Sequence, residues 1–150
     1  MATTQEFDGA KVALFLGHRL LIIRRDDRPD IVDAGLWDFP GGGREGEETP
    51  FQTVARETRE EVGLVLTPAC VLWQRRFAAP QGSDRWFFVA RLLARMQADV
   101  VFGDEGQGWR MADVPEVLAL PDVAGALQQR LALWLAGEAA CDAVPAGLSV

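Results

Sequence analysis

Three glutamates, Glu57, Glu60 and Glu61, stand close enough in the sequence for one helical turn to carry all of them. At about 100° per residue, Glu60 and Glu61 lie within roughly 60° of Glu57 around a helix, so the three carboxylates share one face. Like charges at this spacing repel one another and destabilise a helix. A hard divalent cation such as Mg²⁺ or Mn²⁺ removes the repulsion, because it takes carboxylate oxygens as ligands. The spacing is therefore suited to a metal site.

An ordinary solvated acidic helix face is the alternative interpretation of the same pattern. Arg56 stands four residues before Glu60, and Arg59 lies nearby, so both arginines could form surface ion pairs that contribute little to stability. Charged helix faces are common, and a Glu-x-x-Glu-Glu pattern taken alone favours this alternative. The sequence around the glutamates is needed to choose between a metal site and a solvated acidic helix face.

The helix that would carry them has clear boundaries. Thr49 can act as N-cap, Pro50 suits the first helical position, and Gln52 completes a capping box. Gly63 is suited to the left-handed C-terminal cap. The residues predicted to face the core are Phe51, Val54, Ala55, Thr58 and Val62. Three glycines, 41–43, precede the helix and allow the backbone to come close to a ligand.

Together these residues form a specific motif. Gly42, Glu48, Arg56-Glu57, Glu60-Glu61 and Gly63-Leu64 match the Nudix box, G-x5-E-x7-R-E-U-x-E-E-x-G-U, in which U is a bulky aliphatic residue. Thr58, at the first U position, is the one departure. The flanking segments 37–42 and 104–109 also resemble the family. The chain is thus identified as resembling Nudix hydrolases of the MutT type, which implies an α/β fold, an α/β/α sandwich around a mixed sheet.

The resemblance also implies roles for particular residues. Glu57, Glu60 and Glu61 would hold Mg²⁺ or Mn²⁺ together with the backbone carbonyl of Gly41, and Glu105 would be a further ligand. Either Glu57 or Glu105 would serve as general base. Arg56 would orient the glutamates, chiefly through Glu60, whereas Glu48 and Gly63 would be structural.

Candidate substrate-binding residues lie outside the helix. Arg25 could contact a phosphate or the base, although a solvated arginine at a strand end is equally compatible with the sequence. Phe39, like Trp37, Phe77 and Trp86, could stack on a nucleobase, but aromatic residues are more often in the core. Asp122 could contact the base edge or cap a helix that begins at Val123. Gly42 would allow close approach of the substrate to the backbone.

The remaining elements are predicted from hydrophobic patterns. Lys11–Leu16 and Arg19–Arg24, separated by Gly17-His18, predict a β-hairpin, and Leu36–Phe39 predicts a short strand. The further elements predicted are strands in 65–77 and 85–94 separated by a turn at 80–83, a short strand at 100–102 within an acidic loop, and a helix over 123–136.

Length and charge limit the class of protein. The chain has 150 residues, which predicts a single domain with an ordered core over about 8–137 and a flexible tail at 138–150. No apolar run is long enough to span a membrane. The first residues are polar, unlike a signal peptide, and the two cysteines suit neither a disulfide framework nor a metal knuckle. We therefore expect a cytoplasmic monomer or homodimer.

The net charge of −7 opposes binding of a nucleic-acid backbone, so no nucleic-acid partner is expected. A phosphorylated small molecule would also be repelled unless a cation lay between it and the protein. Together with this need for a cation, the resemblance to Nudix hydrolases implies Mg²⁺-dependent hydrolysis of a phosphoanhydride bond in a nucleoside diphosphate linked to another moiety, with nucleoside triphosphates first among the substrates. The alternatives are a nucleotide-sugar or dinucleoside polyphosphate hydrolase, or a module that senses nucleotides without cutting them.

Overall fold

The computed structural model describes residues 6–79 and 84–140. Its strands are β1 (Phe7–Leu16), β2 (Arg19–Arg24), β3 (Trp37–Asp38), β4 (Gly41–Gly43), β5 (Val71–Phe77), β6 (Asp84–Leu92) and β7 (Gly108–Ala112). The helices are α1 (Pro50–Val62), α2 (Val114–Ala119) and α3 (Leu127–Leu135), with two 3₁₀ helices, η1 (Pro68–Cys70) and η2 (Ala94–Asp99).

Strand β1 organises the mixed sheet, whose main order is β3-β2-β1-β6-β5. It pairs in parallel with β6 along its whole length and antiparallel with β2 at its carboxyl end. At its amino end it pairs antiparallel with β4, so that Gly9 lies between Gly43 on one side and Arg85 on the other. Strand β7 continues the sheet beyond β2. The predicted mixed sheet is confirmed.

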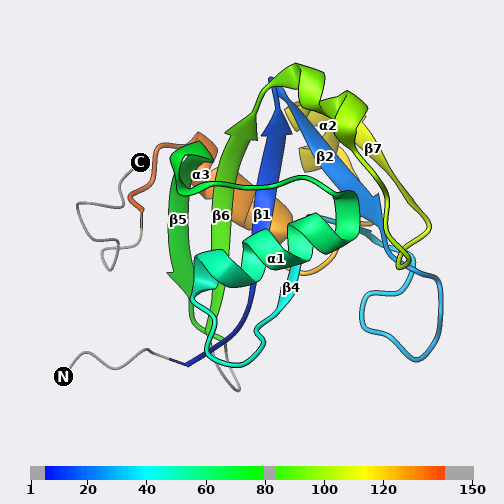
Figure 1. Ribbon diagram of the computed structural model, residues 1–150, viewed down its shortest axis with the longest axis horizontal. Coiled ribbons are helices and arrows are strands. Elements are labelled where there is room, and N and C mark those ends of the chain that lie inside the picture. Colours follow the sequence, from blue (N-terminus) through cyan, green and yellow to red (C-terminus); the bar gives the residue numbers. More distant parts are fainter. Residues whose placement is uncertain (1–5, 80–83, 141–150) are drawn as a thin grey trace.

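Helices cover both faces of the sheet. Figure 1 shows α1 crossing one face and α3 lying behind the other. Val54 and Val62 of α1 belong to one core cluster, whereas Leu127 and Leu131 of α3 belong to the second. The side chains of the central strand alternate between the two clusters, as a period of two residues requires. This is the α/β/α sandwich that the sequence predicts. In the described part of the chain, no helix is both long and apolar enough to cross a membrane.

Helix α1 has the boundaries that its sequence predicts. The Thr49 hydroxyl accepts a hydrogen bond from the Gln52 amide, and the Gln52 side chain accepts one from the Thr49 amide. Gly63 ends the helix with φ of 74°. Val54, Thr58 and Val62 are buried as expected, while Phe51 and Ala55 are partly buried against the same cluster.

Several other boundaries differ from the predictions. Strand β5 begins at Val71 rather than at residue 65, because Pro68 lacks an amide hydrogen and starts a 3₁₀ turn. Residues 100–102 form no strand, and the glycines 41–43 form β4 instead of a loop. The last helix begins at Leu127 rather than at residue 123, because Gly125 has φ of 53° and interrupts it. Strand β7 and helix α2 were not predicted.

Two predictions lie wholly or largely outside the described residues. The turn at 80–83 is one of them. The predicted flexible tail is the other, since only its first residues, 138–140, are described.

Candidate active site

Strand β4 consists of three glycines, so it contributes no side chain to its contact with helix α1. A Cβ atom added to Gly42 would lie 2.5 Å from the Glu57 carboxyl carbon, so a larger residue there would displace that carboxylate from its position. The neighbouring Gly41 amide donates a hydrogen bond of 2.9 Å to Glu61 Oε1. The three glycines therefore serve as a surface against which two of the predicted metal ligands pack.

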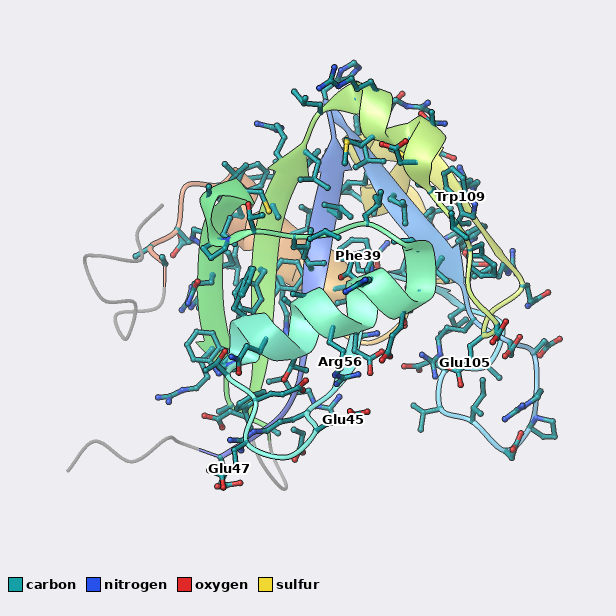
Figure 2. All side chains as sticks on the ribbon, viewed as in Figure 1. Phe39, Glu45, Glu47, Arg56, Glu105 and Trp109 are labelled. Atoms are coloured by element: carbon teal, nitrogen blue, oxygen red, sulfur yellow. The ribbon has the colours of Figure 1, made fainter. Side chains whose placement is uncertain are left out.

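Arg56 joins this strand to the helix and to the loop between them. Its Nε lies 2.7 Å from Glu48 Oε2, and its Nη2 donates to the Gly43 carbonyl at 2.8 Å. Its Nη1 lies 3.0 Å from Glu57 and 3.2 Å from Glu60. Figure 2 shows Arg56 beneath α1, next to the loop that carries Glu45. The arginine does contact Glu60, as predicted, but its shortest bond is to Glu48.

Glu48 holds the loop in place, as predicted. Its carboxylate accepts hydrogen bonds from the Glu45 amide at 3.0 Å and from the Thr53 hydroxyl at 3.0 Å, in addition to those from Arg56. The Arg56 hydrogen bond lowers the pKa of Glu48 from 4.5 to about 2. The same hydrogen bond raises the pKa of Arg56, so both groups remain charged across the neutral range.

The three α1 glutamates differ in their surroundings. Glu60 is exposed, Glu57 is mostly covered, and Glu61 lies deeper, against Gly41. Burial raises the pKa of Glu57, and it raises the pKa of Glu61 to about 8, with the charges of Glu57 and Asp38 adding to the effect. Carboxylates crowded together in this way gain most from a nearby cation.

The loop that carries Glu105 is attached to the end of α1. The amides of Val101 and Gly103 donate to the carbonyls of Val62 and Glu61, each at 2.9 Å. A side chain at Gly103 would collide with the Glu60 carbonyl. These contacts place exposed Glu105 in the wall of the same cavity as Glu61, although Figure 2 shows it on a loop well away from Arg56.

Lys11 and Asp38 belong to the site and were missed by the sequence reasoning. Lys11 Nζ lies 2.9 Å from Asp38 Oδ2 and 3.1 Å from the Gly41 carbonyl, and Arg25 Nη1 lies 3.0 Å from the same Asp38 oxygen. A lysine within the otherwise apolar run 10–16 was the available signal. Two cations thus share one buried carboxylate beside the glycines.

Two cavities meet at this cluster. The larger, of about 730 Å³, lies between the amino end of β1, β6 and the start of α3, and Gly42, Lys11 and Arg25 line it. The smaller, of about 360 Å³, is lined by Glu61 and Glu105 together with Arg25 and Asp38. Because Arg25 and Asp38 line both cavities, a ligand in the larger one can extend toward the carboxylates.

The NUDIX domain model matches residues 7–135, most of the chain. The chain belongs to the Nudix family. It is a Nudix hydrolase, and its curated relatives are pyrophosphohydrolases by name. The RNA pyrophosphohydrolase of Gluconacetobacter diazotrophicus is 46% identical over 120 residues, covering 66% of this chain and 71% of the relative. The protein of the same name from Halorhodospira halophila is 35% identical over 123 residues, covering 61% and 68%. For the one from Pseudomonas paraeruginosa, 34% identical, this chain spans 62% of the relative's length.

Solved structures confirm the Nudix fold at low sequence identity. The MutT protein from Methanosarcina mazei superimposes with a TM-score of 0.68 and 19% identity, covering 91% of this chain and 98% of that one. A bifunctional NMN adenylyltransferase/ADP ribose pyrophosphatase from Francisella tularensis, complexed with AMP and a manganese ion, gives 0.67 and 15%, covering 90% and 43%. These likenesses establish the fold of the chain.

The candidate substrate residues of the Nudix chain are not all equally accessible. Arg25 and Gly42 line the larger cavity, as a substrate-binding role requires. Phe39 borders the smaller cavity but is 1% exposed, and its ring packs on Phe87 with 6.2 Å between ring centroids, so its role in stacking on a nucleobase stays a prediction. Asp122 caps no helix. Its carboxylate lies 3.6 Å from Arg24, and α3 begins only at Leu127.

Proposed function

We propose that this Nudix enzyme hydrolyses a phosphoanhydride bond in a nucleoside 5′-diphosphate-type substrate, using Mg²⁺ or Mn²⁺ held by the α1 glutamates. The observation that carries the proposal is the packing of Glu57 against Gly42 and of Glu61 against Gly41. This packing brings the acidic turn of α1 to the strand edge that also borders the larger cavity.

The donor set suits a hard divalent cation. Glu57, Glu60 and Glu61 offer carboxylate oxygens, and Gly41 offers a backbone carbonyl on the same edge. Among the described residues, no three carboxylates are already gathered around one point, since Arg56 and the Gly41 amide hold several of their oxygens. Binding of a cation would therefore require these side chains to turn and Lys11 Nζ, 3.1 Å from the Gly41 carbonyl, to leave that oxygen. The cation would supply neutralisation of phosphate charge and a more acidic water.

The remaining charged residues would position the reacting groups. Arg56 holds Glu57 by a fixed hydrogen bond and keeps the loop that includes Gly43 closed on the helix. Arg25 lines both cavities and would contact a substrate phosphate. Glu57 and Glu105 remain the two candidates for the residue that accepts the proton of the attacking water. Glu105 lines the smaller cavity, whereas Glu57 lies against Gly42, a residue that lines the larger one.

Nucleoside triphosphates are the first substrates to test, because the larger cavity has the volume of a small-molecule site. The 5′-triphosphate end of RNA is a second candidate. The observation that favours it is the 46% identity to an RNA pyrophosphohydrolase that the chain covers over 71% of its length. An RNA end would meet the enzyme through one or two nucleotides, so the acidic surface as a whole opposes it less than it opposes a duplex.

A substrate panel tests the proposal. The purified chain would be incubated with canonical and oxidised nucleoside triphosphates, a nucleotide sugar, a dinucleoside polyphosphate and a 5′-triphosphorylated RNA, each with Mg²⁺ and with excess EDTA. We expect metal-dependent release of phosphate or pyrophosphate from at least one class. Absence of turnover throughout, in a chain that is folded by circular dichroism, would contradict the proposal and favour a nucleotide-sensing module.

A further inference from the structure

Two arginines on the wall of the larger cavity stand apart from the other charged groups around it. Arg85, on β6, and Arg130, on α3, both line the cavity. In the part of the chain that the structure describes, neither makes an ion pair within 4.0 Å of a carboxylate. Lys11 and Arg25, the other two cations of the lining, are both bound to Asp38. Two basic groups of the cavity therefore have no acidic partner within ion-pair distance among the described residues.

Within the described part of the chain, the carboxylates beside Arg85 in the chain or in the lining of the cavity either pair with other cations or make no ion pair. Asp84, next to Arg85 in the chain, is 3.1 Å from Arg76. Asp38 is shared by Lys11 and Arg25. Asp8 and Asp33 also line the cavity, but neither comes within ion-pair distance of an arginine. An added anion would thus be the first close counter-charge for the pair.

Packing fixes the guanidinium of Arg130, and the sheet register fixes the backbone of Arg85. Phe77 of β5 stands directly opposite Arg85 of β6 in the sheet register. The guanidinium of Arg130 lies over the same Phe77 ring, 4.5 Å from its centroid. The pair thus shares one aromatic neighbour. Burial lowers the pKa of Arg130, and the positive charge of Arg85 lowers it further, as two close like charges would.

The amino end of α3 adds to the positive character of this wall. Ala126 and Leu127 line the cavity, and the N-cap, Ala126, makes no side-chain hydrogen bond to the first turn. The first amides of the helix therefore have no side-chain partner, and the helix dipole places partial positive charge there. Arg130 is on the same face as Leu127, one turn later.

We call the edge of the sheet formed by Gly41–Gly43 the glycine edge. The distance from the two arginines to the glycine edge matches the size of a nucleoside. Gly9 of β1 pairs with Gly43 on one side and with Arg85 on the other. Two inter-strand spacings, about 10 Å, therefore separate the backbone of Arg85 from the glycine edge. A nucleoside whose 5′-phosphates lie at that edge would present its 3′ oxygen toward the arginines.

We propose that Arg85 and Arg130 bind a second phosphate group of the substrate, one that is not cleaved and lies on the 3′ side of the nucleoside. This inference rests on the proposed function, because it takes the scissile phosphates to lie at the glycine edge. The same chemistry has two sources. One is a terminal 3′-phosphate on a mononucleotide, and the other is the phosphodiester that begins the next residue of an oligonucleotide.

Binding of compounds without an anhydride bond tests the pair apart from catalysis. Calorimetric titrations in Mg²⁺ would compare adenosine 5′-monophosphate, adenosine 3′,5′-bisphosphate and the 5′-phosphorylated dinucleotide pApA. We expect the wild-type chain to bind the bisphosphate at least about ten-fold more tightly than the monophosphate, since each arginine adds charge-assisted hydrogen bonds. A similar gain for pApA assigns the oligonucleotide source, whereas a gain for the bisphosphate alone assigns the terminal phosphate.

Variants show whether the gain belongs to these residues. In the double variant Arg85→Gln/Arg130→Gln the ratio of the two affinities should fall to within about two-fold, with monophosphate binding kept. Arg85→Gln alone, at an exposed position, should lower the ratio part-way and guards against misfolding caused by loss of the Arg130–Phe77 contact. Arg95→Gln, which removes the same charge from an exposed position outside the cavity lining, is the matched control and should leave the ratio unchanged.

Failure of this inference is distinguishable from failure of the proposed function. Equal affinity of the wild-type chain for the monophosphate and bisphosphate, or a preference that survives in the double variant, would overturn the second phosphate site even if nucleoside triphosphates are hydrolysed. A bisphosphate preference lost in the double variant, together with no hydrolysis across the substrate panel, would support the site and overturn the proposed activity.

Discussion

The two ends of the larger cavity are built in opposite ways. At the glycine edge, Arg56 is bound by Glu48, Glu57 and Glu60, and its other nitrogen donates to Gly43. At the far wall, Arg85 and Arg130 meet no described carboxylate within ion-pair distance. One end has its charges satisfied within the protein, and the other leaves them available.

This difference agrees with the roles proposed for the two ends. Carboxylates that are to bind a metal must be held in position before the metal arrives, and Arg56 does this through its hydrogen bonds to Glu57 and Glu60. A wall that is to bind an anion must keep its donors free, because an internal carboxylate would compete with the ligand. The comparison predicts that substitutions at the glycine edge alter catalysis or stability, whereas those at the far wall alter selectivity.

The largest effect is expected from removal of the charge at the centre of the glycine edge. Glu57→Gln should lower kcat by about 10²–10⁴-fold, because it removes a candidate metal ligand and base while keeping the size of the side chain that fills the space beside Gly42. Steady-state kinetics with the best substrate of the panel would measure this. The matched control is Glu47→Gln, an exposed glutamate in the loop before α1, which Figure 2 shows pointing outward.

Near-wild-type turnover of Glu57→Gln in Mg²⁺ would contradict the assignment. A large loss in Glu105→Gln alone would then make Glu105 the base. If both variants retain activity, the reaction does not take place on this edge, and the contrast between the two ends of the cavity loses its functional meaning.

Loss of the internal arginine should reduce stability. Arg56→Ala leaves Glu48 and Glu57 without their shared donor and removes the bond to Gly43, at an expected cost of about 1–3 kcal/mol in the free energy of unfolding. Urea denaturation in EDTA would measure it. Arg56→Lys should recover only part of the loss, because an ammonium group cannot reproduce the planar fork. Equal stability of the wild type, Arg56→Ala and Arg56→Lys would show that Arg56 does not stabilise the glycine edge.

The ion pair of Glu48 should make the stability of the chain depend on acid pH. The pKa of Glu48 is lowered from 4.5 to about 2 in the folded protein, so its contribution is fully present above pH 4.5 and is lost as the pH falls toward 2. The difference in unfolding free energy between wild type and Glu48→Gln should therefore shrink over that interval, from roughly 1–2 kcal/mol toward zero. Other carboxylates titrate in both proteins and cancel. A difference that is constant from pH 6 to pH 2 would contradict the pairing.

The same two regions show what the sequence could and could not predict. The glycine edge and α1 were predictable because their signals are local. Thr49, Gln52 and Gly63 mark the ends of the helix, and the spacing of three glutamates on one turn needs only the helical period. The far wall was not predictable, since Phe77, Arg85 and Arg130 come from separate elements that only the sheet register and the docking of α3 bring together.

Other predictions failed where local signals were weak or misleading. Strand β7 carries no clear alternation, and its pairing with β2 determines it. No local signal around Phe39 shows that its ring packs on Phe87 in the second core cluster, because Phe87 comes from a different strand. Lys11 was visible as a charge in an apolar run, yet its partner, Asp38, lies in a different strand.

The smallest effect is expected at the one position where the chain departs from the Nudix box. The Thr58 side chain is fully buried on α1, and its hydroxyl is the only buried side-chain polar atom among the described residues without a hydrogen-bond partner. Thr58→Val keeps the shape and removes the desolvated hydroxyl, so it should raise the unfolding free energy by about 1 kcal/mol and Tm by roughly 2–4 °C. Thr53→Val is the matched comparison, because Thr53 is equally buried but bonded to Glu48 at 3.0 Å, and it should lose stability instead. If Thr58→Val is destabilising, the hydroxyl has a partner in solution. If Thr58→Val is stabilising and kcat is unchanged, Thr58 affects only the packing of α1 against the core. The ion pairs of Arg56 at the glycine edge then do not depend on it.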